Sequence, residues 1–398
     1  MNRITQCLHG HGTVSAMMKH RQTPSDPVPS KYLAFSGMPR PVVFWNLTER
    51  CNLSCTHCYS RSGPDCRTES ELTTSEALGF IDDLASMGVP LVLFSGGEPL
   101  LRHDVWELAE YGVAKGIKIA LSTNGTLITS KIAAKIRKSG IEYAGISLDG
   151  ATAATHDRFR GMQGAFDRSV AAITRCHDAG VRCGVRVTLT RENFGELGDL
   201  IDLAMSLGAS RFCLYWLVPS GRGRESYSRM QLGNKEVTEA LNLLYRKAEE
   251  TDPDTMEFLT VDSPQDSVHL LQSMERDGSP DLDDARDLLT SLNGGCSAGN
   301  RVANVDPLGN VYPCQFARSR DFFIGNIRDR PFSALWADSS HPVLALFREK
   351  PLRIKGECGE CRYFGICGGG CRVRAYREEG DFSEKDPFCF INENTTLQ

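Results

Sequence analysis

Three cysteines stand close together in the stretch Cys51-Asn52-Leu53-Ser54-Cys55-Thr56-His57-Cys58. Three thiolates from one short loop can bind three irons of a cubane [4Fe-4S] cluster, because sulfur is a preferred ligand of iron in such clusters. The fourth iron would then keep a free position for a substrate or a cofactor. A disulfide pair or a zinc site with His57 as fourth ligand is the alternative. We favour the cluster, because His57 stands between two cysteines and has little freedom to turn inward.

A second motif, Gly96-Gly97-Glu98-Pro99, follows a second apolar run of the chain. Glycines allow the backbone to approach a bound ligand closely, and Glu98 offers a carboxylate that can accept from an ammonium group. Alone, the motif could be an ordinary turn between a strand and a helix. It becomes informative because it comes one expected strand after the three-cysteine loop.

The C-terminal part of the chain holds seven of the fifteen cysteines. In a reducing compartment, such a pattern favours metal binding or catalysis over structural disulfides. A zinc ribbon is an alternative for the first CxxC pair alone. The seven residues are Cys296, Cys314, Cys358, Cys361, Cys367, Cys371 and Cys389. By contrast, Cys176, Cys183 and Cys213 lie in apolar periodic segments, and we expect them in the core.

The elements that must position these residues alternate between short apolar runs and amphipathic helical stretches. The expected strands are Val42–Thr48, Leu91–Ser95, Ile117–Ser122, Tyr143–Leu148, Val185–Leu189 and Phe212–Leu217. Helical patterns such as Thr74–Met87 and Ala133–Ser139 lie between them. Short apolar strands joined by helices predict a parallel sheet that is covered on both faces. We therefore expect an α/β protein with a partial (β/α)6 TIM-type barrel, whose active site lies at the carboxyl ends of the strands.

The domain organisation follows from this pattern. We expect an N-terminal extension over 1–40, the partial barrel over 41–225, a charged helical bridge over 226–295 and a cysteine-rich metal domain over 296–398. A net charge of -5 with scattered basic residues argues against a nucleic-acid surface. No apolar run is long enough to span a bilayer, and the N-terminus lacks the apolar core of a signal peptide. A cytoplasmic location is therefore expected.

CxxxCxxC after a first strand and GGEP after a second resemble the radical S-adenosylmethionine (SAM) superfamily, over 41–225. The resemblance implies that Cys51, Cys55 and Cys58 bind a [4Fe-4S] cluster whose open iron chelates the amino and carboxylate groups of SAM. Reductive cleavage of SAM then gives methionine and a 5′-deoxyadenosyl radical, and the barrel positions this radical against the substrate. Further SAM contacts implied by the resemblance are Tyr59 near adenine, Gly96 and Gly97, Glu98 on the ammonium, Ser122 and Asn124 near the ribose, and Ser147 and Arg186 on the carboxylate. A salt bridge inside the barrel is the alternative for Arg186.

The seven C-terminal cysteines, with Gly309 between the first two, are similar to the SPASM domain, which carries auxiliary [4Fe-4S] clusters. By this resemblance, one closed cluster would be bound by Cys358, Cys361, Cys367 and Cys389. A second would be bound by Cys296, Cys314 and Cys371. Some relatives add an eighth cysteine shortly before the first of the seven. The nearest one here is Cys213, so a second cluster with an open iron, or a single auxiliary cluster, stays an alternative.

Two further stretches, 156–161 and 215–224, are expected at the functional rim of the barrel. Arginines there can bind carboxylates in a bidentate manner, and Tyr215 or Trp216 could line a flat apolar ligand. Solvated loops with ordinary salt bridges are the alternative. Together with the sequence around the cysteine loop, these stretches resemble the SPASM enzymes that modify iron tetrapyrroles, above all the didecarboxysiroheme deacetylases of haem biosynthesis.

This resemblance implies removal of acetate side chains, leaving methyls, from 12,18-didecarboxysiroheme to give Fe-coproporphyrin III. It also implies a low-potential electron donor of the flavodoxin or ferredoxin type. The alternatives are removal of propionates in haem d1 synthesis, modification of a peptide by a SPASM maturase, and a non-enzymatic iron–sulfur scaffold or electron carrier. Peptide maturases usually carry a winged-helix segment before the barrel, and the first forty residues are too short and irregular for one. Cys7, His9 and His11 could bind the tetrapyrrole iron, although we favour a mobile, unliganded tail.

Overall fold

The computed structural model describes residues 2–14, 40–291, 295–349 and 351–391. One eleven-stranded sheet runs through them in the order β1-β8-β7-β6-β5-β4-β3-β2-β9-β10-β11. The strands are β1 Asn2–Arg3, β2 Val42–Thr48, β3 Leu91–Gly96, β4 Lys118–Thr123, β5 Tyr143–Ser147, β6 Cys183–Leu189, β7 Arg211–Trp216, β8 Glu257–Val261, β9 Val302–Val305, β10 Asn310–Tyr312 and β11 Gly325–Asn326. All neighbours from β9 to β8 pair in parallel, which is the arrangement of an open TIM-type barrel.

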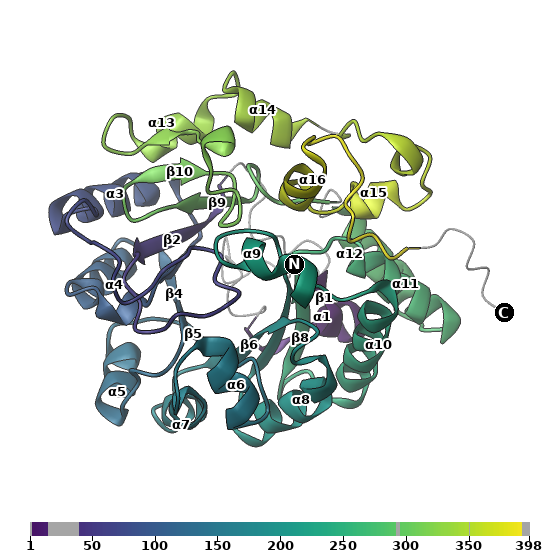
Figure 1. Ribbon diagram of the computed structural model, residues 1–398, viewed down its shortest axis with the longest axis horizontal. Coiled ribbons are helices and arrows are strands. Elements are labelled where there is room, and N and C mark those ends of the chain that lie inside the picture. The colour runs from purple at the N-terminus through teal and green to yellow at the C-terminus, as the bar shows by residue number, and fades with distance from the viewer. Residues whose placement is uncertain (1, 15–39, 292–294, 350, 392–398) are drawn as a thin grey trace, which may run out of the picture.

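Helices cover the outside of this curved sheet, as Figure 1 shows. Those of the barrel are α3 Thr74–Met87, α4 Val105–Ala114, α5 Ser130–Lys138, α6 Ala153–Arg160, α7 Ala165–Asp178 and α8 Leu197–Ser206. They are followed by α9 Gly223–Met230, α10 Asn234–Glu250, α11 Asp266–Arg276 and α12 Leu282–Ser291. No helix in the described ranges is long and apolar enough to cross a membrane.

The six predicted strands correspond to β2 to β7, so the predicted α/β barrel is confirmed. Local signals explain the agreement at α3. Its N-cap Thr73 accepts from the backbone of Glu76, whose side chain in turn caps Thr73, and Gly88 ends the helix in the left-handed conformation. The helix then packs on the sheet through Phe80, whose ring meets the buried Trp45 of β2 edge-on at 4.9 Å.

The predicted helical bridge over 226–295 is wrong in one respect, because it contains strand β8. This five-residue strand pairs in parallel with β7 and antiparallel with β1, and so it extends the sheet beyond the six predicted strands. Both pairings join β8 to segments far along the chain, so they cannot be inferred from the local sequence. The three charged helices around it, α10, α11 and α12, dominate the local pattern of the sequence.

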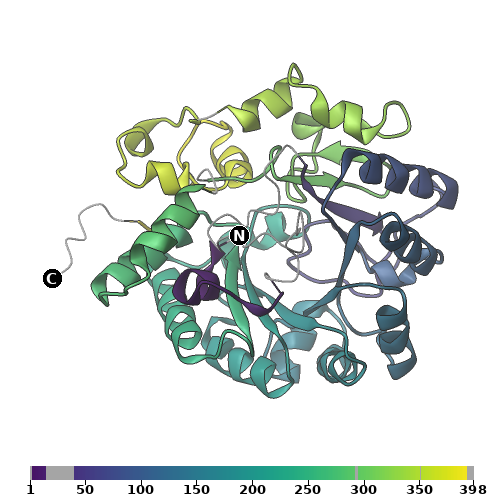
Figure 2. The ribbon, with the colours of Figure 1, turned by 180° about the vertical axis from the view of Figure 1, so that it is seen from behind.

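The predicted mobile tail is also wrong for residues 2–14, which pack against the barrel. Strand β1 leads into helix α1 Ile4–His9, which lies against β8 and is seen in purple in Figure 2. Cys7 is only 3% exposed, and Nε2 of His9 lies 3.0 Å from the carbonyl oxygen of Ala248. These two side chains are thus held in the scaffold and line no part of the cavity described below. The rest of the extension, 15–39, lies outside the described residues.

The C-terminal domain continues the barrel sheet. β9 pairs in parallel with β2, and β10 and β11 follow in antiparallel pairing. Helices α13 Phe332–Ala337, α14 Pro342–Arg348, α15 Phe364–Cys367 and α16 Arg372–Glu379 then lie together along one side of the barrel (Figure 1). Their core includes Phe322, Phe347 and Phe382. A fully buried ion pair, with 2.9 Å between Nη1 of Arg374 and Oδ2 of Asp386, lies where this domain meets the barrel.

Candidate functional site

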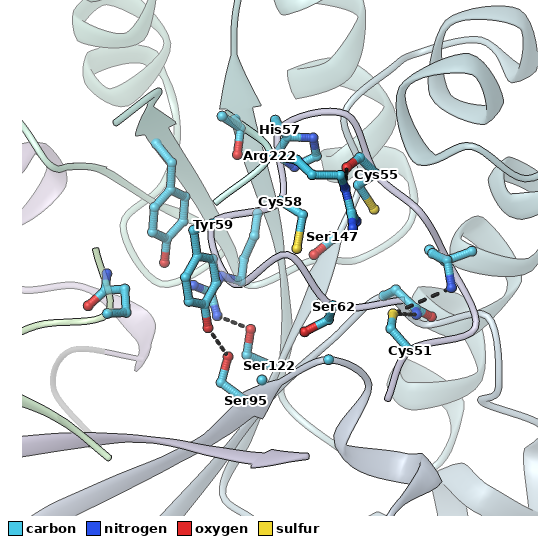
Figure 3. Close-up of a pocket in the computed structure, with 18 of the residues that line it drawn as sticks. Cys51, Cys55, His57, Cys58, Tyr59, Ser62, Ser95, Ser122, Ser147 and Arg222 are labelled. Carbon is cyan, nitrogen blue, oxygen red and sulfur yellow. Dashed lines mark hydrogen bonds between the residues drawn. The ribbon is translucent and has the colours of Figure 1, made fainter. Parts of the chain in front are cut away.

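A cavity opens at the carboxyl ends of the parallel strands, where the fold predicts the active site. It encloses about 1040 Å³ of empty space, part of which is open to solvent. Its wall combines the cysteine loop, the ends of β3 to β8 and two residues of the C-terminal domain, Gln315 and Phe316. Figure 3 shows Cys51, Cys55, Cys58 and Tyr59 among the side chains that surround it.

The three-cysteine loop is held to the barrel by backbone contacts at both ends. The Cys51 amide donates to the Gly63 carbonyl at 3.1 Å, and the Thr56 amide donates to the Phe159 carbonyl at 3.2 Å. Cys51 and Cys55 are each 8% exposed, and burial raises the pKa of Cys51 to about 12. A thiol must lose its proton to bind a metal, so metal binding at this loop would release protons.

The donor set of this loop fits an iron–sulfur cluster. All three thiols line the same cavity, and they are soft ligands of the kind that such clusters require. Two nearby donors point at the sulfurs: the Leu53 amide lies 3.4 Å from Sγ of Cys51, and Nη1 of Arg160 lies 3.7 Å from Sγ of Cys55. Hydrogen bonds of this kind stabilise anionic sulfur and tune the potential of a cluster. Within the described ranges, no three Cys, His, Asp or Glu side chains converge on the position of a single metal ion.

The two glycines of the GGEP motif line the cavity and also hold the cysteine loop in place. Gly96 has a φ of 117°, and a Cβ on Gly97 would lie 2.1 Å from the Arg50 carbonyl oxygen. The amide of Gly97 donates to Thr48 at 2.7 Å, and that of Glu98 donates to Arg50 at 2.9 Å. The motif therefore needs glycine because the end of β3 presses against the backbone that leads into the cysteine loop.

Glu98 itself is not among the residues that line the cavity. Its side chain is fully buried, and Oε1 accepts from Oγ1 of Thr123 at 2.8 Å while Oε2 accepts from the Asn124 amide at 2.9 Å. Burial raises the pKa of this carboxyl to about 7. Glu98 thus ties the turn after β3 to the turn after β4, and its contact with the ammonium of SAM stays a prediction.

The other residues predicted to contact SAM do line the cavity. They are Tyr59, Gly96, Gly97, Ser122, Asn124, Ser147 and Arg186. The Tyr59 hydroxyl lies 3.1 Å from the Ser95 hydroxyl. Arg186 donates to Ser122 and places its guanidinium 4.7 Å from the ring centre of Tyr215, so its observed partners are a hydroxyl and an aromatic face. Their individual roles toward SAM stay predictions.

Two rim arginines turn inward, which the sequence did not reveal. Arg160 is 7% exposed and pairs with the fully buried Asp149, while Arg222 donates from Nε to the Cys55 carbonyl at 2.8 Å. Nη2 of Arg222 is buried and has no hydrogen-bond partner within the described ranges. By contrast, Arg158 and Arg224, from the same two stretches, are exposed. The two sequence stretches indicate where arginines cluster. The direction in which each side chain points depends on its partner across the barrel.

The C-terminal cysteines fall into two neighbourhoods in the structure. Burial raises the pKa of Cys314, and the nearby thiols of Cys296 and Cys371 raise it further by a smaller amount. Burial likewise raises the pKa of Cys367 to about 12, with smaller contributions from Cys389 and Cys358. The first neighbourhood holds the three cysteines of one predicted ligand set, and the second holds three of the four cysteines of the other. The assignment of each cysteine to a cluster stays a prediction.

Comparison with known proteins agrees with this geometry. Residues 45–204 match the radical SAM superfamily, and residues 296–362 match the SPASM iron-sulfur cluster-binding domain. Fe-coproporphyrin III synthase of Methanosarcina barkeri is 38% identical over 372 residues, which are 92% of each chain. AdoMet-dependent heme synthase of the same organism is 36% identical and covers 90% of this chain and 98% of its own. Pre-heme d1 synthase of Dinoroseobacter shibae is 36% identical and covers 89% of this chain and 87% of its own.

The fold has solved counterparts. The crystal structure of Streptococcus suis SuiB bound to S-adenosylmethionine superposes with a TM-score of 0.69 at 19% identity, over 89% of this chain and 78% of that one. A radical SAM domain binds a [4Fe-4S] cluster and SAM, and a SPASM domain binds auxiliary iron–sulfur clusters, so these are the cofactors of the protein. The chain belongs to the radical SAM superfamily, among the enzymes that carry a C-terminal SPASM domain.

Proposed function

We propose that this enzyme removes acetate side chains, leaving methyls, from 12,18-didecarboxysiroheme to give Fe-coproporphyrin III. The observation that carries the proposal is the charge of the cavity wall. Three guanidinium groups, those of Arg160, Arg186 and Arg222, line it together with the aromatic rings of Tyr215 and Trp216. A flat macrocycle with several carboxylates suits such a wall, because arginine binds carboxylates and aromatic rings pack on flat apolar faces. Fe-coproporphyrin III synthase, AdoMet-dependent heme synthase and pre-heme d1 synthase, the relatives named above, favour the same substrate class.

The residues that line the cavity would have different roles in the reaction. Cys51, Cys55 and Cys58 would hold the cluster, and the bound cluster and SAM would supply the radical that abstracts a hydrogen atom from the substrate. Arg222 has a buried nitrogen that is free among the described residues and could bind a carboxylate, while the Arg186 guanidinium lies over the ring of Tyr215. Phe316 of the C-terminal domain and Trp216 of β7 would exclude water from the reacting face of the substrate.

We also place the enzyme in the cytoplasm and infer a low-potential electron donor of the flavodoxin or ferredoxin type. The cysteines support a reducing compartment, because ten of the fifteen are proposed cluster ligands and such cysteine-rich metal sites are typical of reducing compartments. The electron donor follows from the chemistry of the family, in which reductive cleavage of SAM needs a strong one-electron reductant.

The test uses the full-length protein, reconstituted with iron and sulfide without oxygen. With SAM, dithionite and 12,18-didecarboxysiroheme, we expect 5′-deoxyadenosine together with Fe-coproporphyrin III, both followed by liquid chromatography and mass spectrometry. A Cys58→Ala variant serves as the control that cannot complete the cluster. Absence of 5′-deoxyadenosine under every condition would refute the radical reaction. Cleavage of SAM without turnover of the tetrapyrrole would refute the substrate and point to a peptide.

A second candidate is removal of propionates from the same substrate, as in haem d1 synthesis. The relative named pre-heme d1 synthase, with 36% identity, favours it. The product masses separate the two reactions, because propionates and acetates differ by one CH2 group.

A further inference from the structure

Asp262 stands at the carboxyl end of β8, the strand that the sequence pattern does not reveal. Its φ is 75°, one of two positive φ values at non-glycine residues in the described ranges. Nη2 of Arg374 donates to the Asp262 carbonyl oxygen at 3.1 Å and so holds this backbone from the side of the C-terminal domain. A left-handed non-glycine residue costs free energy, less for aspartate than for most residues, and such residues cluster at functional sites.

The side chain of Asp262 lines the cavity, and no other aspartate or glutamate among the described residues does. Its Oδ2 is buried and has no hydrogen-bond partner within the part of the chain that the structure covers. Asp266, four residues later, also has a buried oxygen without a partner among the described residues, Oδ1, but its Oδ2 accepts from Nε1 of Trp216 at 2.7 Å, and the residue lies outside the cavity wall. A buried polar atom without a partner costs free energy unless a ligand supplies one.

Charged and titratable groups face Asp262 from four elements. They are Arg186 of β6, Cys213 and Tyr215 of β7, Asp266 of α11 and Arg374 of α16, and the positive charge of the chain's α-amino group acts on Asp262 as well. Within the described ranges, neither guanidinium forms an ion pair with the Asp262 carboxylate. Burial raises the pKa of this carboxyl to about 7, and the positive charges of the chain's α-amino group, Arg374 and Arg186 lower it by less. A large fraction of the carboxyl is therefore neutral near pH 7, and a neutral carboxyl can donate a hydrogen bond.

We propose that Asp262 contacts the substrate and donates a hydrogen bond from its protonated carboxyl to a carboxylate side chain of the substrate. The proposal rests on the proposed function, because it takes the substrate to be a tetrapyrrole with several carboxylates. Asp262 would then fix the orientation of the macrocycle next to the positive charge of Arg186. Deprotonation would place a negative charge against the substrate carboxylate and weaken binding.

The test is the binding of 12,18-didecarboxysiroheme to the reconstituted protein with SAM, followed by the change in the Soret band between pH 6 and 8.5. If only the neutral form binds, the wild-type Kd rises by up to about 30-fold over this range, because about one molecule in 30 is protonated 1.5 pH units above the pKa. Asp262→Asn keeps an N–H donor at every pH and tolerates the left-handed backbone, so its Kd should stay nearly constant. Asp262→Gly removes the donor and relieves the backbone, so it should bind about tenfold more weakly at pH 6 without a lower Tm.

Asp266→Asn is the matched control, a buried carboxyl of the same helix–strand junction that lies outside the cavity. Its Kd should still rise with pH as in the wild type, with the midpoint moved slightly down because a negative charge that raises the pKa of Asp262 is lost, even if its Tm falls. A wild-type Kd that is independent of pH, or an Asp262→Asn variant with the wild-type pH dependence, would overturn the role of Asp262. If the Soret band of the tetrapyrrole does not change when wild-type protein is added, the proposed substrate is wrong, and the proposed role of Asp262 is wrong as well. A loss of SAM cleavage without substrate that equals the loss of substrate binding in Asp262→Gly would mark a merely structural residue.

Discussion

Replacement of Asp386 by Asn should destabilise the enzyme strongly through one buried ion pair. Arg374 and Asp386 are 0% and 1% exposed, and Oδ2 of Asp386 accepts from Nη1 of Arg374 at 2.9 Å, from the Cys371 amide at 2.7 Å and from Nε2 of Gln265 at 2.9 Å. Removal of one member of a buried pair leaves an uncompensated charge and costs about 3–5 kcal/mol. That is a large part of the roughly 5–15 kcal/mol that stabilises a typical protein.

The assay is urea unfolding of the reconstituted protein without oxygen, followed by tryptophan fluorescence. Glu225→Gln is the control, because its ion pair with Arg61 is more than 60% exposed on both sides and such pairs contribute about 0–1 kcal/mol. Arg374→Met combined with Asp386→Asn should cost less than the sum of the single changes by about 2 kcal/mol, since the stranded charge is then removed. A loss below about 1 kcal/mol for Asp386→Asn, or strictly additive single changes, would refute the argument.

Three further predictions concern the site and its support. Cys58→Ala should abolish SAM cleavage but leave the iron of the auxiliary clusters in place, which iron analysis and electron paramagnetic resonance would detect; unchanged cleavage would contradict the ligand assignment. Gly97→Ala should lower both Tm and cluster content, because its Cβ would lie 2.1 Å from the Arg50 carbonyl oxygen, whereas Gly79→Ala has nothing within 4 Å and should be tolerated. Burial lowers the pKa of His156 to about 3, so folding favours its neutral form. The free energy of unfolding should therefore fall as the pH falls from about 6.5 toward 3. In urea titrations at several pH values, His156→Gln should show a smaller change of this free energy with pH.

The elements that the sequence predicted well are those with strong local signals. Helix α3 has a capping box at Thr73 and a glycine stop at Gly88, and its predicted bounds agree with the structure. Strand β2 is an apolar run of seven residues before a cysteine loop, and it too was predicted in full. Strand β8 has five residues between charged helices, and only its pairing with β7 and β1 identifies it as part of the sheet.

At the site, too, some features were predicted from the sequence and others were not. The resemblance to the radical SAM superfamily implied that the three cysteines, the glycines of GGEP and the ends of β4 to β6 would lie around one site, and the structure places them around one cavity. It could not predict side-chain direction, because direction depends on partners far along the chain. Glu98 turns to Thr123 and Asn124 and does not itself line the cavity. Asp262 could not be found at all, because its strand was missing from the predicted sheet.

The pairing of β9 with β2 has a consequence for how the enzyme can be divided and how it can move. β2 carries the cysteine loop at its end, and β9 belongs to the C-terminal domain, so the two walls of the cavity are joined by a backbone ladder. A truncation before β9 would expose an unpaired strand edge, which is a template for aggregation. Hinge opening between the two domains would likewise break this ladder. The spacing between the two walls is therefore set when the chain folds, and a large substrate must reach the cavity through movement of loops and side chains.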